Sequence, residues 1–183
     1  VSGISKIIDS AEQYQSAHAS LMADEAEQLA RHLGLPPETI VSVKVAAYLH
    51  DCGELAVPKT LLNTPKKLSN EEWDLLKTHP IVGEFSLRKV LPGNDEVSSL
   101  IRWHHERWDG SGYPDRLCGE EIPLGARILA LVDAVSAMSG DRPFRARLPQ
   151  ERIKEELNRL AGFHFDPEIV KAWLAVQKSQ NNP

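Results

Sequence analysis

The order of the histidines and aspartates is the feature that most constrains what this chain can fold into. They fall inside or at the edge of segments whose apolar residues recur with helical spacing: His18, His50, Asp51, His79, His104, His105 and Asp133. An imidazole buried in a helical core needs a hydrogen-bond partner or a ligand, because burying an unsatisfied polar group is unfavourable. The pattern therefore predicts that a cation satisfies these side chains in a metal-centred hydrolytic site.

Helical spacing extends over almost the whole chain, whereas strand signals are nearly absent. One helix is expected over residues 4–29, stopped by Gly34, with His18 on its inward face. A second is expected over residues 36–51, with a proline pair at its start and Gly53 closing it. The adjacent histidine–aspartate pair thus stands at a helix end, where side chains can converge on an ion.

Capping residues and prolines mark the remaining boundaries. Ser69 and Glu72 form a capping-box pattern, and His79-Pro80 marks a break. Residues 108–121 form a loop rich in glycine and proline, and Asp166 is an N-cap before a proline. Further helices are expected over residues 70–78, 81–90, 95–105, 123–135, 149–160 and 167–177. The sequence therefore predicts an all-α fold, a compact single-domain helical bundle.

Composition narrows the classes of function. With 183 residues, the chain is long enough for one domain with a substantial core. Its formal net charge of -5 argues against a DNA or RNA polymer as partner, because such proteins are usually basic. Cys52 and Cys118 form no paired framework, which favours a reducing cytoplasm. No apolar run approaches the ~20 residues that span a membrane, so no membrane contact is expected.

Imidazole and carboxylate together suit octahedral coordination of iron, manganese, nickel or cobalt better than a closed zinc site, which favours thiolates. The ligands are too numerous for one ion with an open position, but they suit two ions with Asp51 as the bridge. Two ions can make hydroxide at neutral pH and neutralise a phosphoryl group. The composition of the site therefore predicts hydrolysis of a phosphoester without a covalent protein nucleophile.

A purely structural role is the alternative for each residue taken singly. A histidine–aspartate pair such as His50-Asp51 is common by chance, and His79 before a proline can simply cap a helix. Asp133 is the most telling position, because a carboxylate within an apolar helix is unfavourable unless it is paired or bound to a metal. His32 and His164 lie outside the pattern and are expected to be ordinary surface or packing residues.

These residues, in this order, resemble the HD superfamily of metal-dependent phosphohydrolases. The stretch His104-His105-Glu106-Arg107-Trp108-Asp109-Gly110-Ser111-Gly112-Tyr113-Pro114 resembles the signature of HD-GYP domains. The resemblance continues through residues 122–128, Asp133, the stretch Arg142-Pro143-Phe144-Arg145 and the stretch Phe165-Asp166-Pro167. It covers nearly all of residues 1–183, which are identified as one HD-GYP domain. Because the chain begins Val-Ser-Gly without an initiator methionine, we expect it to be a piece of a longer protein.

The resemblance implies hydrolysis of cyclic di-GMP to pGpG or GMP by a hydroxide activated by two metal ions. It implies two divalent ions, iron or manganese first and nickel, cobalt or zinc as other choices. One ion is expected to be held by His18, His50, Asp51 and Asp133, and the other by Asp51, His79, His104 and His105. The implied substrate-binding residues are Gly112, Tyr113, Pro114, Arg142 and Arg145. Family members usually follow a sensor or receiver domain in the bacterial cytoplasm, and a protein partner or homodimer is also open.

Some positions depart from the family's pattern. Glu54, which with Asp51 is assigned to the catalytic positions, replaces the usual lysine and would repel phosphates. Ser136 replaces a frequent acid, and Tyr14 stands where some members place a third-metal glutamate, so two metals are expected rather than three. These changes leave two alternatives open. One is a metal-binding regulatory module without turnover, and the other is a phosphohydrolase acting on a different nucleotide phosphoester.

Overall fold

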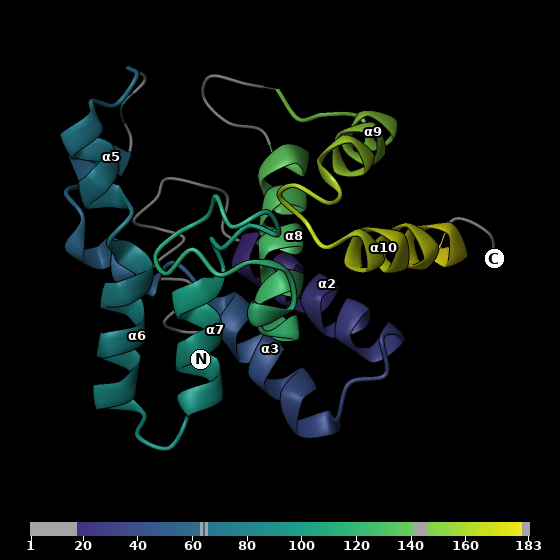
Figure 1. The fold of residues 1–183 in the computed structure, drawn as a ribbon, viewed down its shortest axis with the longest axis horizontal. Coiled ribbons are helices and arrows are strands. Elements are labelled where there is room, and N and C mark those ends of the chain that lie inside the picture. The colour runs from purple at the N-terminus through teal and green to yellow at the C-terminus, as the bar shows by residue number, and fades with distance from the viewer. Residues whose placement is uncertain (1–17, 63, 65, 141–145, 181–183) are drawn as a thin grey trace.

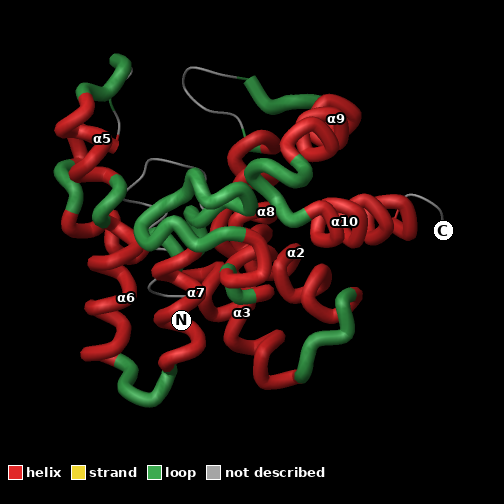
Figure 2. The backbone as a smooth tube through the Cα atoms, viewed as in Figure 1, coloured by secondary structure: helices red, strands yellow, loops and turns green. Residues whose placement is uncertain are grey.

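The regular structure of the chain is helical, which confirms the predicted all-α class (Figure 1, Figure 2). The computed structural model describes residues 18–62, 64, 66–140 and 146–180. Within them the helices are α2 (His18–His32), α3 (Pro37–Leu49), α4 (Lys59–Leu62), α5 (Asn70–Leu76), α6 (His79–Val90), α7 (Asp95–Trp103), α8 (Leu124–Ser139), α9 (Gln150–Leu160) and α10 (Pro167–Gln180). Two 3-10 helices join them, η1 (Cys52–Ala56) and η2 (Gly119–Glu121). An isolated β-bridge links Ala161 and Phe165.

Helix α8 is the centre of the bundle. It packs against α2, α3, α7, α9 and α10, and it crosses the middle of the molecule in Figure 1. Its buried residues are Gly125, Ala126, Ile128, Leu129, Leu131, Val132, Val135 and Met138. Asp133 and Ser136 lie three residues apart on the half-buried side of this helix. The Asp133 carboxylate therefore leaves the apolar core and faces the region where α3 ends.

The predicted helix-ending and capping residues are confirmed at three places. Gly34, at a φ of 71°, ends α2 with the two backbone hydrogen bonds of a Schellman motif. Ser69 and Glu72 cap α5 reciprocally, through bonds of 3.2 and 2.7 Å. Asp166 accepts from the amide of Glu168 at 2.8 Å and also pairs with Arg127 at 2.6 Å. The last pair ties the start of α10 to α8.

The predicted role of Gly53 as the residue closing the second helix is wrong. Helix α3 already ends at Leu49, and the chain continues through Asp51 into η1, which contains Gly53. Gly53 is buried, and a Cβ added there would lie 1.9 Å from the carbonyl oxygen of His79. This glycine is therefore required by a close approach of two backbones, and this tertiary contact leaves no trace in helical periodicity.

The boundary predicted at His79-Pro80 also differs in detail. His79 is the first residue of α6 rather than part of a break, because proline is accepted in the first turn of a helix. Helix α6 packs against η1 and α7. As a result the C-terminal end of α3, the start of α6 and the C-terminal end of α7 meet beside α8. None of the described helices is long and apolar enough to cross a membrane.

Candidate metal centre

Three histidines share one local geometry. In each, ring nitrogen Nδ1 meets the backbone carbonyl three residues earlier, at 2.9 Å for His50 on Ala47, 2.8 Å for His79 on Leu76 and 2.7 Å for His104 on Ile101. A carbonyl oxygen only accepts, so Nδ1 carries the proton and donates in every case. These bonds hold each ring in one orientation and turn Nε2 toward the site, as is usual for histidines that bind metals.

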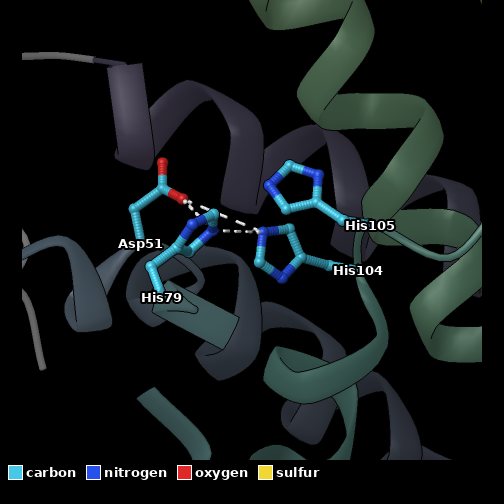
Figure 3. Close-up of side chains that lie close together, drawn as sticks. All are labelled: Asp51, His79, His104 and His105. Carbon is cyan, nitrogen blue, oxygen red and sulfur yellow. Dashed lines mark hydrogen bonds and ion pairs between the residues drawn. The ribbon is translucent and has the colours of Figure 1, made fainter. Parts of the chain in front are cut away.

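The Nε2 atoms of His79 and His104 face one another at 3.4 Å (Figure 3). Because Nδ1 is the donor in both rings, both Nε2 atoms present lone pairs when the rings are neutral. Two lone pairs at this distance repel unless a cation lies near both. Burial, reinforced by the charges of the neighbouring histidines, lowers the pKa of His104 well below its usual range, which disfavours a proton there. The donor set therefore fits a metal ion.

The carboxylate of Asp51 lies between two groups of imidazoles. Its Oδ2 is 2.8 Å from Nε2 of His50. Its Oδ1 is 3.5 Å from Nε2 of His79 and 3.8 Å from Nε2 of His104, and Figure 3 shows this oxygen directed at both rings. The two oxygens of this carboxylate therefore face different imidazoles, His50 on one side and His79 with His104 on the other.

The pair formed by His50 and Asp51 is charged. Burial is the largest single influence on His50 and opposes its protonation. The charge and hydrogen bond of Asp51, the charge of Asp133 and the hydrogen bond to Ala47 together outweigh burial and raise the pKa of His50 to about 10. Burial would also raise the pKa of Asp51, yet the charges of the surrounding imidazoles, His50 first, hold it well below its usual range. A proton on Nε2 of His50 thus occupies the position that a bound cation would take.

His105 adds the last member of the cluster. The candidate ligand atoms of His105, Asp51, His79 and His104 all lie within 4.8 Å of one another. Burial, followed by the charge of His79, lowers the pKa of His105 to about 3, so this ring is neutral and can offer a lone pair. The ring of Tyr113 lies 4.9 Å from that of His105 at a tilt of 31°. Burial raises the pKa of Tyr113, so its hydroxyl keeps its proton at neutral pH.

Asp133 and Glu54 reach this region from two further elements. Oδ1 of Asp133, on α8, lies 3.9 Å from Nε2 of His50, on the side served by Oδ2 of Asp51. Glu54, in η1, is half-buried, and its charge is one of those that raise the pKa of Tyr113. The structure thus gathers candidate ligands around both oxygens of Asp51.

Not every predicted site residue can be placed. The side chain of His18, and the whole of Arg142 and Arg145, lie outside the described residues. His32 is exposed at the end of α2, and His164 is half-buried beside Phe165. Neither belongs to the cluster that the described residues form, in agreement with their expected surface or packing roles.

The stretch of residues 104–114, here called the signature loop, contains two glycines that are required for different reasons. Gly110 adopts a φ of 78°, the left-handed region in which glycine is favoured, and it forms a tight turn. Gly112 is buried, and a Cβ added there would lie 2.3 Å from the amide nitrogen of Arg107. The first glycine therefore serves a turn and the second a close approach of backbones. Tyr113, directly after the second glycine, lies against the ring of His105.

A buried carboxylate that we did not single out from the sequence holds the loop. Glu106 is 2% exposed, and its Oε1 accepts from the amides of Asp115 at 2.6 Å and Arg116 at 3.0 Å. The carboxylate of Asp115 also accepts hydrogen bonds from Arg102, at 2.7 and 2.8 Å, and from the indole of Trp103, at 2.6 Å. The far side of the loop is thereby anchored to α7. The position of an acid directly after the two histidines was a signal for such a role.

Replacing Glu106 with alanine is expected to lower the free energy of unfolding by about 1–3 kcal/mol, because the backbone amides of residues 115 and 116 lose their buried acceptor. Urea denaturation measures this change, and hydrogen exchange at residues 115 and 116 should speed up. Glu106→Gln keeps an acceptor oxygen and is expected to lose less. Equal losses in both variants would mean that packing, not the hydrogen bonds, explains the effect.

Comparison with known proteins places the chain in a family. A family model described as "HD domain" matches residues 3–169. A cyclic di-GMP phosphodiesterase response regulator from Xanthomonas campestris pv. campestris is 37% identical over 179 residues, covering 95% of this chain and 46% of the relative. A 3'3'-cGAMP-specific phosphodiesterase from Vibrio cholerae is 34% identical over 178 residues, covering 95% of this chain and 34% of the relative.

The fold has a counterpart among solved structures. A crystal structure of a cyclic GMP-AMP specific phosphodiesterase from V. cholerae superposes with a TM-score of 0.73 at 20% identity, covering 98% of this chain and 47% of that chain. The present chain spans less than half the length of these curated relatives. The matched family, the helical bundle and the histidine–aspartate cluster all agree. This chain belongs to the HD domain family and is related to the HD-GYP phosphodiesterases within it.

Proposed function

We propose that this chain is a metal-dependent phosphodiesterase that hydrolyses cyclic di-GMP to pGpG or GMP. The observation that carries the proposal is the division of the Asp51 carboxylate between His50 on one side and His79 with His104 on the other. That arrangement suits two divalent ions, with iron or manganese as the metals we expect for a donor set of nitrogen and oxygen. Relatives named as phosphodiesterases for cyclic di-GMP and for 3'3'-cGAMP support a cyclic dinucleotide as substrate.

The proposed ligand set keeps the division of the sequence analysis. His50 and Asp133, with His18, hold the ion on the Oδ2 side of Asp51, while His79, His104 and His105 hold the ion on the Oδ1 side. Ions bound there would polarise a phosphoryl group and lower the pKa of a bound water.

The chain's own groups orient the reactants. The hydrogen bonds from Nδ1 to backbone carbonyls hold the rings of His79 and His104 in one orientation with Nε2 toward the site, so these two ligands need no rearrangement. The buried Gly112 lets residues 113 and 114 approach the histidines and form one wall of the substrate site. We propose that Arg142 and Arg145 contact a phosphate of the substrate.

The deciding experiment is turnover by protein reconstituted anaerobically with Fe(II) and, separately, Mn(II). Cyclic di-GMP and 3'3'-cGAMP are supplied in parallel, and the products are separated by chromatography. We expect the linear dinucleotide or mononucleotide from cyclic di-GMP. Absence of turnover of both compounds with two equivalents of metal bound would favour the second candidate, a regulatory module that binds a ligand without hydrolysing it.

Glu54 is the specific observation behind that second candidate. Its negative charge lies in η1, three residues after Asp51, and it is one of the charges that raise the pKa of Tyr113, a proposed substrate-binding residue. Replacing Glu54 with lysine changes the local charge by two units, and it is expected to lower the Kd for cyclic di-GMP about tenfold at low salt. Isothermal titration of metal-loaded protein measures this change.

Glu54→Gln serves as the matched variant, because it removes the charge without adding a positive one. It is expected to give an intermediate Kd, and the difference between the variants should shrink as salt is added. An affinity that is unchanged or weaker in Glu54→Lys would show that Glu54 does not repel the substrate, and its assignment to the catalytic positions would then gain support.

A further inference from the structure

Helix α5 contributes no residue to the hydrophobic core. None of its residues is buried, and its indole at Trp73 is 43% exposed. Most of the stability of a short helix in a protein comes from packing an apolar face, and seven residues are too few to form a stable helix alone. The reciprocal capping by Ser69 and Glu72 holds this helix in place at its start. A helix maintained without burial, and carrying an exposed indole, indicates a role in binding.

That helix forms one wall of a cavity of about 790 Å³, which we call the α5 pocket. Trp73 and Asp74 line it from α5, and Lys77 lines it from the position directly after that helix. His105, Arg107 and Tyr113 line it from the signature loop. Such a volume lies within the range of pockets that hold small molecules. In Figure 1 the helix stands at the edge of the molecule beyond α6, away from the core around α8.

The α5 pocket adjoins the candidate metal centre through one shared residue. His105 belongs both to its lining and to the histidine–aspartate cluster. Tyr113 lies against the same ring at 4.9 Å. A molecule held in the pocket therefore lies beside the groups that would hold the metal, and it can extend from one to the other.

The charged residues of the pocket favour an anion. Lys77 and Arg107 provide two cations against the single carboxylate of Asp74. Asp74 lies 3.6 Å from Lys77, and both side chains remain largely open to solvent, at 77% and 44%. A flat aromatic ring beside flexible cations is the combination that binds a nucleobase by stacking and its phosphate by charge.

We propose that the α5 pocket is a guanine-nucleotide subsite. Trp73 stacks on the base, and Lys77 and Arg107 bind the phosphate. Asp74 accepts hydrogen bonds from the Watson–Crick edge of the base. The subsite deepens the proposed function and rests on it for the identity of the whole ligand. Guanine offers two neighbouring N–H donors on this edge, which one carboxylate can accept together, and adenine lacks that pair. Cyclic di-GMP and 3'3'-cGAMP each contain guanine, so the subsite suits both.

The test measures binding of cyclic di-GMP and of pGpG to the Mn(II)-loaded chain by isothermal titration. Trp73→Ala is expected to raise both Kd values about tenfold, the effect of losing one stacked base, while Trp73→Phe should retain most of the affinity. Metal content is expected to stay the same in both variants. Leu75→Ala is the matched control, because Leu75 is 44% exposed on the same helix and does not line the α5 pocket.

The readouts separate this subsite from the proposed reaction. If the unaltered chain hydrolyses cyclic di-GMP but Trp73→Ala leaves Kd unchanged, the subsite is refuted and the reaction stands. If the chain binds guanine ligands through Trp73 without hydrolysing them, the subsite stands and the reaction is refuted. Failure of the unaltered chain to bind any guanine ligand overturns the subsite.

The base preference is tested separately with cyclic di-AMP as the competitor. Asp74→Ala is expected to reduce the preference for cyclic di-GMP over cyclic di-AMP by about tenfold. The reason is that guanine loses the carboxylate that accepts its N–H donors, whereas adenine has no such pair of donors. A ratio that does not change would overturn the assignment to guanine.

Discussion

Replacing Asp51 with alanine is expected to remove metal from both sides of the centre and to reduce phosphodiesterase activity by about a thousandfold or more. The physical reason is the division of its carboxylate, with Oδ2 at 2.8 Å from His50 and Oδ1 at 3.5 Å from His79. Without the bridging charge, only imidazoles remain among the proposed ligands of the ion on the Oδ1 side, and Asp133 is the one carboxylate left for the other ion. The electrostatic help that metals give to phosphoryl transfer is worth several kcal/mol. Elemental analysis after dialysis, paired with product chromatography, measures both effects.

Asp51→Asn keeps the shape of the side chain and separates charge from volume. We expect it to lose metal almost as completely as the alanine variant, because a neutral amide is a poor bridge between cations. His32→Ala, at an exposed position outside the cluster, should keep its full metal content. Retention of two equivalents by Asp51→Ala would refute the bridge, and retention of one would restrict Asp51 to a single ion.

Replacing Gly53 with alanine is expected to destabilise the fold by about 3 kcal/mol or more and to lower metal content with it. The added Cβ would lie 1.9 Å from the carbonyl oxygen of His79 and 2.7 Å from the amide nitrogen of Gly83. Both are backbone atoms of α6, so no side chain can rotate away, and η1 and α6 must separate. His79 moves with that backbone, and urea denaturation with elemental analysis measures the two consequences.

Gly93→Ala is the comparison for this substitution. Gly93 has a φ of 89°, but a Cβ there would meet nothing within 4 Å. The cost is therefore limited to backbone strain of about 1 kcal/mol, and metal binding should not change. If Gly53→Ala behaves like Gly93→Ala, the contact between η1 and α6 is not what positions His79.

The sequence was sufficient for the fold class and for most of the residues that meet in the site. Apolar spacing identified the helices, and the capping pattern of Ser69 with Glu72 located the start of α5. The chemistry of imidazole and carboxylate pointed to a metal before any geometry was known, because few other groups satisfy so many buried histidines. These properties are local or chemical, and they can be read from neighbouring residues.

Several features of the site could not be predicted in this way. The sequence predicts Gly53 at a helix end, whereas the structure requires glycine there because the backbone of α6 approaches too closely for a Cβ. Asp133 lies within an apolar helix, as expected, but its distance of 3.9 Å from His50 depends on how α8 packs against α3. The hydrogen bonds of Glu106 could not be predicted, because the amides of Asp115 and Arg116 reach it only when the loop folds back on α7.

The sequence by itself thus determined which residues can offer nitrogen and oxygen ligands, because ligand chemistry belongs to the side chain. Tertiary structure alone decided how they share one carboxylate, since Oδ2 and Oδ1 of Asp51 turn toward different helices. It also placed Trp73 beside the signature loop, across a cavity between segments distant in the chain. The physical reason is that periodicity and capping act over a few residues, whereas the site is built from contacts between helices.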